Sequence, residues 1–167
     1  LFNEPLSFLA VGHLLGAHAP GIRSPKAFVA GVHHVNLAHA SGAAAVRAAS
    51  GDAVVGPPQY FSPIQSTGTT SLHRKAERSA DAMMNRIFVE PGLGLGYPED
   101  DLPLLRHLSA VRRSGDDEAV RVDLDFMGAQ YYTRHRAYPA PVPGLVWGVP
   151  VPGRNFRKFD LTTMGWE

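Results

Sequence analysis

The chain opens with Leu1-Phe2-Asn3-Glu4-Pro5, in which a polar pair follows two apolar residues and precedes a proline. Because proline disfavours helical geometry in the residue before it, Glu4 is predicted to lie at, or just beyond, the end of a strand. Barrel and open-sheet α/β enzymes keep their functional groups at such strand ends. On its own this stretch is more often an ordinary loop start, so the rest of the chain has to decide.

Composition predicts a globular domain without a charged partner. The 167 residues are 44% hydrophobic and 19% charged, with a formal net charge of +1, and the basic residues are scattered. This balance gives no reason to expect nucleic acid or a membrane as a partner, and neither a signal peptide nor a long apolar run is present. The lack of cysteine excludes disulfides and makes the cytoplasm the expected location. The first and last residues indicate that both ends are cut.

The first half of the chain predicts a helix, a strand and a second helix. Ser24 and Pro25 have the properties of an N-cap and a first helical residue, and the apolar residues from 26 to 49 fall near helical spacing. A short buried strand is predicted at 53–56, stopped by Pro57 and Pro58. A polar loop then leads to Ser71, which is predicted to cap a helix with an apolar stripe through residue 87.

The second half continues the same alternation. A helix is predicted from about residue 101 to 113, followed by a solvated turn at 114–118. Apolar and polar residues alternate from 120 to 126, which predicts a strand that continues to residue 133. The proline-rich stretch 137–153 is predicted to be a long surface loop. The order of strand end, helix, strand, helix and strand is typical of a parallel α/β architecture.

Several familiar site patterns are absent. The three glycines in 92–96 follow a helix, whereas a dinucleotide-binding turn follows a strand. His33, His34 and His39 lack zinc-protease spacing and are interpreted as packing and hydrogen-bonding residues of one helix. No cofactor or metal is therefore predicted. Tyr131 and Tyr132 are either strand-filling residues or, at a strand end, hydrogen-bond partners of a functional carboxylate.

Seven separated motifs together resemble one enzyme family, glycoside hydrolase family 1, which contains β-glucosidases and β-galactosidases. No single motif is decisive, but their order along the chain is that of the family. They are Phe2-Asn3-Glu4-Pro5, Ala19-Pro20-Gly21, His33-His34 with Leu37-Ala38-His39, Gly96-Tyr97-Pro98, Asp125-Phe126-Met127-Gly128, Tyr131-Tyr132-Thr133 and Met164-Gly165-Trp166-Glu167.

The resemblance implies a partial (β/α)8 TIM barrel that covers the end of strand 4 through strand 6 and its following loop. Residues 1–167 are then a fragment of a single catalytic domain, truncated at both ends. The implied activity is that of a retaining β-glycosidase, which hydrolyses a β-linked glucoside, a related oligosaccharide or an aryl glycoside. The sugar, the aglycone and the oligomeric state stay open.

The resemblance also assigns roles to individual residues. Glu4 matches the general acid/base of the Asn-Glu-Pro motif, and Asn3 matches the residue that holds the sugar 2-hydroxyl. Tyr132 matches a tyrosine that contacts the nucleophile. Gln130 matches a substrate-binding position that is usually asparagine, so its longer side chain displaces the amide.

The nucleophile is not found on this chain. A retaining glycosidase needs a second carboxylate about 5–5.5 Å from the acid/base. In the family it lies in a Thr-Glu-Asn-Gly motif that this sequence lacks, and Glu167 matches a different motif. The chain is therefore expected to be inactive alone. The alternatives are a non-catalytic carbohydrate-binding or interaction module derived from the same barrel, or an unrelated α/β domain in which the motifs coincide.

Overall fold

The computed structural model describes residues 2–152 and 162–164. Leu1 and most of the Met164-to-Glu167 motif, including Glu167, lie outside the described residues. The chain starts with helix α1 (Pro5–Leu9), which continues directly into the π-helical turn η1 (Ala10–Leu14).

The long helix α2 (Pro25–Ala49) follows the prediction closely. Ser24 accepts a 3.2 Å hydrogen bond from the backbone N–H of Ala27, and Pro25 is the first helical residue. Phe28, Val29 and Val32 are fully buried on the face that packs inward. An N-cap, a proline at N1 and an apolar face all act locally, which explains why the sequence was sufficient here.

The second helical group is shorter and more irregular than predicted. Helix α3 (Ser71–Asp81) is capped by Thr70 rather than Ser71, and it continues into the π-helical turn η2 (Ala82–Arg86). A one-turn helix, α4 (Val89–Gly92), follows. The predicted helix at 101–113 is the 3₁₀ helix η3 (Pro103–Ala110), and the predicted turn at 114–118 contains the short helix α5 (Asp116–Ala119).

The first parallel pair consists of β1 (Pro58–Tyr60) and β3 (Gly128–Gln130). The strand predicted at 53–56 was wrong by several residues, because a proline is tolerated as the first residue of a strand. Pro57 also contributes, since its carbonyl accepts a 3.0 Å bond from the N–H of Gly128. The prediction of a strand at 120–133 is confirmed only at 128–130.

Residues 120–127 use other contacts in place of a strand ladder. The backbone N–H of Val122 bonds to the carbonyl of Gly92, and the Asp125 carboxylate accepts bonds from Arg47 and from the N–H of Val55. A Cβ on Gly56 would collide with the Phe126 carbonyl, so only glycine permits this approach. The alternating pattern therefore reflects half-buried irregular backbone.

The predicted loop at 137–153 was wrong, because residues 135–152 form a hairpin. Strand β4 (His135–Val142) pairs with β2 (Ile64–Ser66) in parallel and with β5 (Val146–Pro152) in antiparallel orientation. The prolines of β4 and β5 lie at positions that have no ladder partner for their missing N–H groups. Since His135 donates toward β2, Pro139 faces that same edge beyond the end of β2, where β4 is unpaired, and Pro141 lies at the irregularity between Pro139 and Val142. Pro150 and Pro152 lie on the outer edge of β5.

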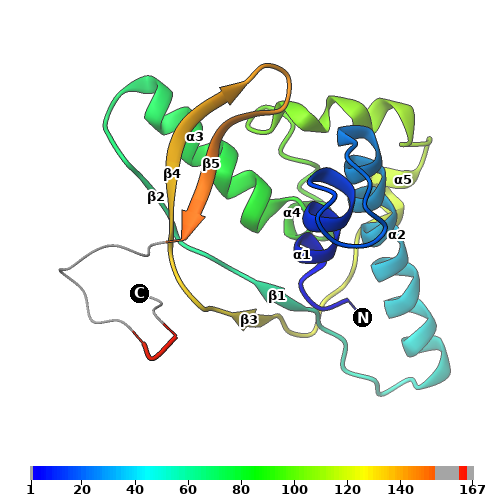
Figure 1. Ribbon diagram of the computed structural model, residues 1–167. Helices are drawn as coiled ribbons and strands as arrows, with labels where there is room; N and C mark the ends of the chain where they lie inside the picture. Colours follow the sequence, from blue (N-terminus) through cyan, green and yellow to red (C-terminus); the bar gives the residue numbers. More distant parts are fainter. Residues whose placement is uncertain (1, 153–161, 165–167) are drawn as a thin grey trace.

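Figure 1 shows how these elements are arranged: α3 lies against the β2-β4-β5 sheet, and α2 lies near the start of the chain and β1. The larger core combines α2 with η3 and neighbouring turns; its fully buried members include Phe28, Ile87, Leu102 and Leu105. The two parallel pairings join the same two stretches of chain, 58–66 and 128–142. Within the described ranges the strands form no closed barrel.

No helix in residues 2–152 or 162–164 combines the length and apolar character needed to cross a bilayer.

Candidate active site

Glu4 has an unusual backbone conformation. Its φ of 45° and ψ of 58° are left-handed, and within the described ranges it is the one non-glycine residue with positive φ. Glu4 itself is therefore not part of a strand, and it directly precedes helix α1. Left-handed geometry in a residue without a special preference for it costs of order 1–3 kcal/mol and concentrates at functional sites. The strained backbone makes Glu4 a candidate functional residue.

The structure brings the four predicted site residues together in two pairs. The Tyr132 hydroxyl donates a 2.8 Å hydrogen bond to Glu4 Oε1, and Gln130 Nε2 donates a 3.0 Å bond to Asn3 Oδ1. Gln130 is the last residue of β3, and Tyr132 follows two residues later, so alternation places both side chains on one side of the strand. Neighbouring residues at the start of the chain therefore meet neighbouring residues near the end of β3.

Each Glu4 oxygen has a hydroxyl donor. Oε1 accepts from Tyr132, and Oε2 accepts a 3.3 Å bond from Ser7 on the first turn of α1. The hydrogen bond to Glu4 is the main cause that raises the pKa of Tyr132, with burial and the charge of Glu4 adding to it. Tyr132 therefore stays protonated as a donor. The arrangement offers a carboxyl group that can exchange protons, held by two neutral hydroxyls.

The Asn3 amide is oriented by Gln130. Because Gln130 donates to Asn3 Oδ1, the amide N–H groups are what the exposed Asn3 can present to a ligand hydroxyl. Gln130 Oε1 is buried and has no hydrogen-bond partner among the residues that the structure describes. The longer glutamine side chain thus makes a specific contact to the site.

Tyr60 is a site residue that sequence reasoning missed. Its ring stacks on Tyr132, with centroids 5.6 Å apart and planes at 24°. Burial raises the pKa of Tyr60, and the Glu4 carboxylate adds to this. Residue 60 had been predicted to lie in a loop, so its face could not be assigned. The aromatic pair Tyr60-Phe61 was the available signal that a strand continued there.

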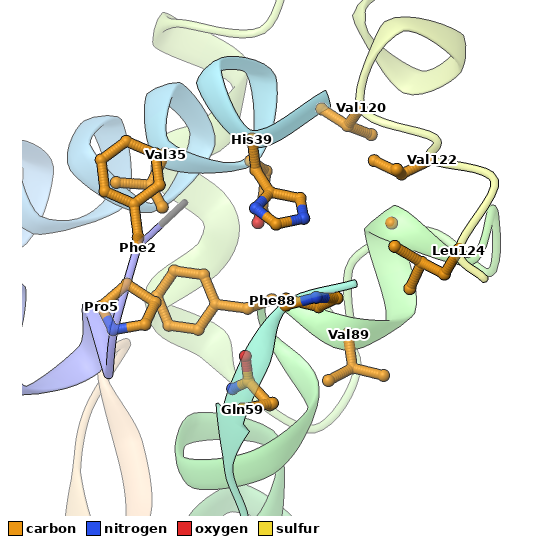
Figure 2. Close-up of a pocket in the computed structure, with 13 residues that line it drawn as sticks. Phe2, Pro5, Val35, His39, Gln59, Phe88, Val89, Val120, Val122 and Leu124 are labelled. Atoms are coloured by element: carbon orange, nitrogen blue, oxygen red, sulfur yellow. The ribbon is translucent and has the colours of Figure 1, made fainter. Parts of the chain in front are cut away.

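A hollow lies on the other side of β1. Gln59, next to Tyr60 in the strand, points into a largely apolar pocket, and Figure 2 shows Phe2, Val35, Phe88 and His39 around it. Burial lowers the pKa of His39, whose Nε2 has no hydrogen-bond partner in the described part of the chain. Because adjacent strand residues point to opposite faces, Gln59 and Tyr60 face different sides of β1, although Phe2 and Pro5, on either side of Asn3 and Glu4, also line this pocket.

His33 serves packing and hydrogen bonding, as predicted. This side chain is fully buried, with Nδ1 2.9 Å from the Tyr97 hydroxyl and Nε2 2.9 Å from Asp116 Oδ2. It thereby joins α2 to the loop around residue 97 and to α5. Over residues 2–152 and 162–164, no group of three or more histidine, aspartate or glutamate side chains is placed to hold a metal ion.

Comparison with known proteins identifies the family. The sequence model of glycosyl hydrolase family 1 matches residues 1–146. The chain belongs to this family. A β-glucosidase from an Agrobacterium strain is 31% identical over 168 residues, which cover 99% of this chain and 36% of that protein. β-Glucosidase A from Thermotoga maritima is 29% identical over 176 residues, with 99% and 36% covered.

Solved structures of family 1 enzymes give the same result. The virulence factor SghA from Agrobacterium tumefaciens is similar with a TM-score of 0.82 and 29% identity, covering 99% of this chain and 37% of SghA. The family 1 β-glucosidase from Thermotoga maritima has a TM-score of 0.77 and 26% identity, with 99% and 36% covered. The Thermotoga enzyme is a TIM-barrel β-glucosidase, and the chain spans a little over a third of the length of these two proteins, which agrees with a partial barrel.

Proposed function

We propose that this chain carries the acid/base half of a retaining β-glycosidase active site, with β-glucosides as the substrate class. The contact between Glu4 and Tyr132 carries the proposal, because it joins the two motifs that the family resemblance had singled out independently. Membership of glycosyl hydrolase family 1 and the β-glucosidase relatives support the reaction class. A structure of SghA with its substrate analogue salicin, an aryl β-glucoside, supports the substrate class.

In this proposal Glu4 moves the proton. The protonated carboxyl donates to the glycosidic oxygen as the bond to the leaving group breaks, and the carboxylate then removes a proton from the attacking water. Tyr132 and Ser7 hold the two carboxyl oxygens in place throughout. Asn3 presents its amide N–H groups to the sugar 2-hydroxyl, with Gln130 fixing the amide orientation.

The proposal needs a nucleophilic carboxylate from outside this chain. Retention requires that group about 5–5.5 Å from the acid/base. No Thr-Glu-Asn-Gly motif occurs in the 167 residues. The isolated chain is therefore expected not to hydrolyse an aryl β-glucoside, and substantial turnover by the purified chain would contradict this division of the site.

The acid/base role of Glu4 is best tested in a chimera. Residues 1–146 replace the matching segment of the Agrobacterium β-glucosidase, which supplies the rest of the barrel, and Glu4→Gln is compared with Glu118→Gln, whose side chain is 76% exposed. Loss of a general acid costs about 10²–10⁴-fold in rate, and glycosylation suffers most with poor leaving groups. We expect Glu4→Gln to slow hydrolysis of alkyl β-glucosides far more than glycosylation by a dinitrophenyl β-glucoside.

The control defines the negative result. If the chimera is active and Glu4→Gln reduces its activity no more than Glu118→Gln does, Glu4 is not the acid/base. Equal losses for good and poor leaving groups would point to a structural effect of the substitution instead of a lost proton donor.

A further inference from the structure

The face of the β1–β3 pair that bears Gln130 and Tyr132 has a third member. Tyr60 is the register partner of Gln130 in the parallel pair, so the two side chains lie on the same face. The Tyr60 and Tyr132 rings are 5.6 Å apart with planes at 24°, within the range of offset-stacked aromatic pairs. Tyr60 thus contacts the residue that bonds Glu4 without bonding Glu4 itself.

Behind Tyr60 lies a buried ring of fixed orientation. The His135 ring meets Tyr60 edge-on, at 6.5 Å between centroids and 81° between planes. His135 Nδ1 is 2.6 Å from the hydroxyl of Ser62, and that hydroxyl is 2.8 Å from the carbonyl of Thr133. Since a carbonyl can only accept, Ser62 donates to Thr133 and accepts from the Nδ1–H of His135. One tautomer of His135 and one ring position satisfy both bonds.

Ser62 is in turn fixed to the helical layer. Its backbone N–H donates to Asn85 Oδ1 at 2.9 Å, and Asn85 Nδ2 donates to the Ser62 carbonyl at 2.9 Å. Asn85 belongs to η2, so this pair of hydrogen bonds joins the segment between β1 and β2 to the helical turn that follows α3. Hydrogen bonds thus connect η2 to Ser62 and Ser62 to His135, and ring contacts connect His135 to Tyr60 and Tyr60 to Tyr132.

The ring of Tyr132 lies at the end of this series of contacts. Tyr132 lies beyond the end of β3 and is 38% exposed, so neither a strand ladder nor burial on all sides fixes its side chain. We propose that Tyr60 is a positioning residue of this site, whose ring holds the Tyr132 ring in the orientation that brings its hydroxyl to Glu4. The proposal rests on the proposed function only for the catalytic meaning of Glu4; the positioning itself does not depend on turnover.

The test follows the Tyr132 phenol directly. The chain has five tyrosines, so labelling their Cζ atoms with ¹³C gives few signals, and Tyr132→Phe assigns the one of interest. The pKa of Tyr132 is measured by titration of the 167-residue chain and of Tyr60→Leu, Tyr60→Phe and Glu4→Gln. Tyr138→Leu, which removes an exposed ring from β4, is the matched control.

We expect Tyr60→Leu to lower the Tyr132 pKa toward its ordinary value, by as much as Glu4→Gln does, because the hydroxyl no longer stays on the carboxylate. Tyr60→Phe keeps the ring and loses only the contribution of the Tyr60 charge, the smallest of the causes that raise the Tyr132 pKa, so its value should stay well above that of Tyr60→Leu, whereas Tyr138→Leu should leave it unchanged. A Tyr132 pKa in folded Tyr60→Leu equal to that of the unmodified chain overturns the proposal.

A second measurement needs no substitution. If Tyr60→Leu loses its folded circular dichroism spectrum, nuclear Overhauser contacts between the Tyr60 and Tyr132 ring protons are measured in the unmodified chain. Their presence supports the stacking, and their absence overturns it. Neither readout uses activity, so a chimera that stays active with Glu4→Gln refutes the acid/base role while leaving the positioning by Tyr60 to be judged on its own result.

Discussion

The Tyr132 hydroxyl donates a 2.8 Å hydrogen bond to Glu4 although the two residues are 128 positions apart in the sequence. Only the assembled tertiary structure brings them together, because Glu4 precedes α1 and Tyr132 follows β3. A second long-range hydrogen bond, from Gln130 Nε2 to Asn3 Oδ1, is 3.0 Å long. The candidate site is therefore a long-range feature of the fold, and its formation can be followed through Tyr132.

Glu4→Gln is expected to lower the pKa of Tyr132. The Glu4 carboxylate accepts a hydrogen bond from the protonated phenol, and its negative charge disfavours ionisation of the phenol, so both raise the pKa of Tyr132. This interaction stabilises the folded chain at pH values below about 10, the ordinary tyrosine pKa, and is lost as pH rises through the higher folded value. Titration of ¹³C-labelled tyrosines checks this, with Glu118→Gln as control. An unchanged Tyr132 pKa would show that the contact does not form in solution.

Tyr97→Phe is expected to destabilise the chain by about 1–3 kcal/mol, the cost of leaving buried polar partners unsatisfied. The Tyr97 hydroxyl lies 2.9 Å from His33 Nδ1 and accepts a 3.1 Å bond from Asn36 Nδ2. Urea denaturation at pH 7 measures the effect. Tyr138→Phe, at an exposed ring, should change the free energy of unfolding by no more than about 0.5 kcal/mol. Equal effects of the two substitutions would contradict the role of this network.

The same hydroxyl predicts an alkaline transition. Burial raises the pKa of Tyr97 to about 12. In the unfolded chain the Tyr97 phenol ionises near pH 10. The stabilisation from its buried, protonated form is therefore complete below that pH and is lost as pH rises toward 12. The free energy of unfolding should therefore fall less steeply over this interval in Tyr97→Phe than in the unmodified chain. Identical slopes would show that Tyr97 titrates as an exposed phenol.

Helix α2 could be predicted from the sequence because its signals are local. Ser24, Pro25 and the apolar residues of the inner face act within one or two turns. The same holds for the helix at 71–87, whose apolar stripe was recognised although Thr70 is the cap and the last turn is π-helical. The parallel pairing of β1 with β3 and of β2 with β4 agrees with the architecture predicted from the order of elements, whereas the antiparallel pair β4–β5 was not predicted.

Strand positions could not be predicted, because pairing partners far away in the sequence decide them. Pro58 can start β1 because the first hydrogen bond of the β1–β3 pair uses the carbonyl of Pro57, which accepts from the N–H of Gly128, and requires no N–H from either proline. The prolines of β4 and β5 are accepted because they lie on unpaired edges or, for Pro141, at the irregularity in β4. A proline-rich sequence disfavours a strand in general, and the sequence does not show which edge of a strand lacks a hydrogen-bonded neighbour and can therefore accept proline.

The site was predicted to the extent that family motifs covered it. Asn3, Glu4, Gln130 and Tyr132 were named from the resemblance, and the structure places them in contact. The partner of Tyr132 in the structure is Glu4, whereas the resemblance assigned Tyr132 a contact to the nucleophile, and that contact stays a prediction. Their chemical roles remain proposals. Tyr60 belongs to no quoted motif, and only the register of β1 against β3 places it on the same face.

His135→Asn is expected to weaken the pH dependence of stability. Burial lowers the pKa of His135, which packs against Tyr60 and bonds Ser62. As pH falls, His135 binds a proton near pH 6.5 in the unfolded chain and only at lower pH in the folded chain, so stability is lost as pH falls below about 6.5. Asparagine keeps a donor near Nδ1 but does not titrate. Urea denaturation at pH 7 and pH 5 should show a smaller loss of stability in His135→Asn than in the unmodified chain. An equal loss in the two chains would contradict this.

Leu105→Ala is expected to destabilise the chain by about 2–5 kcal/mol, the range for leucine truncation in a closely packed core. Leu105 is fully buried in the cluster that joins η3 to α2, where a cavity would lie between Phe28, Leu102 and their neighbours. Leu95→Ala is the matched control, since Leu95 is 72% exposed and should change the free energy of unfolding by less than about 0.5 kcal/mol. Both are measured by urea denaturation of the 167-residue chain. Equal effects, or a Leu105→Ala chain as stable as the unmodified one, would mean that the isolated chain does not form this core.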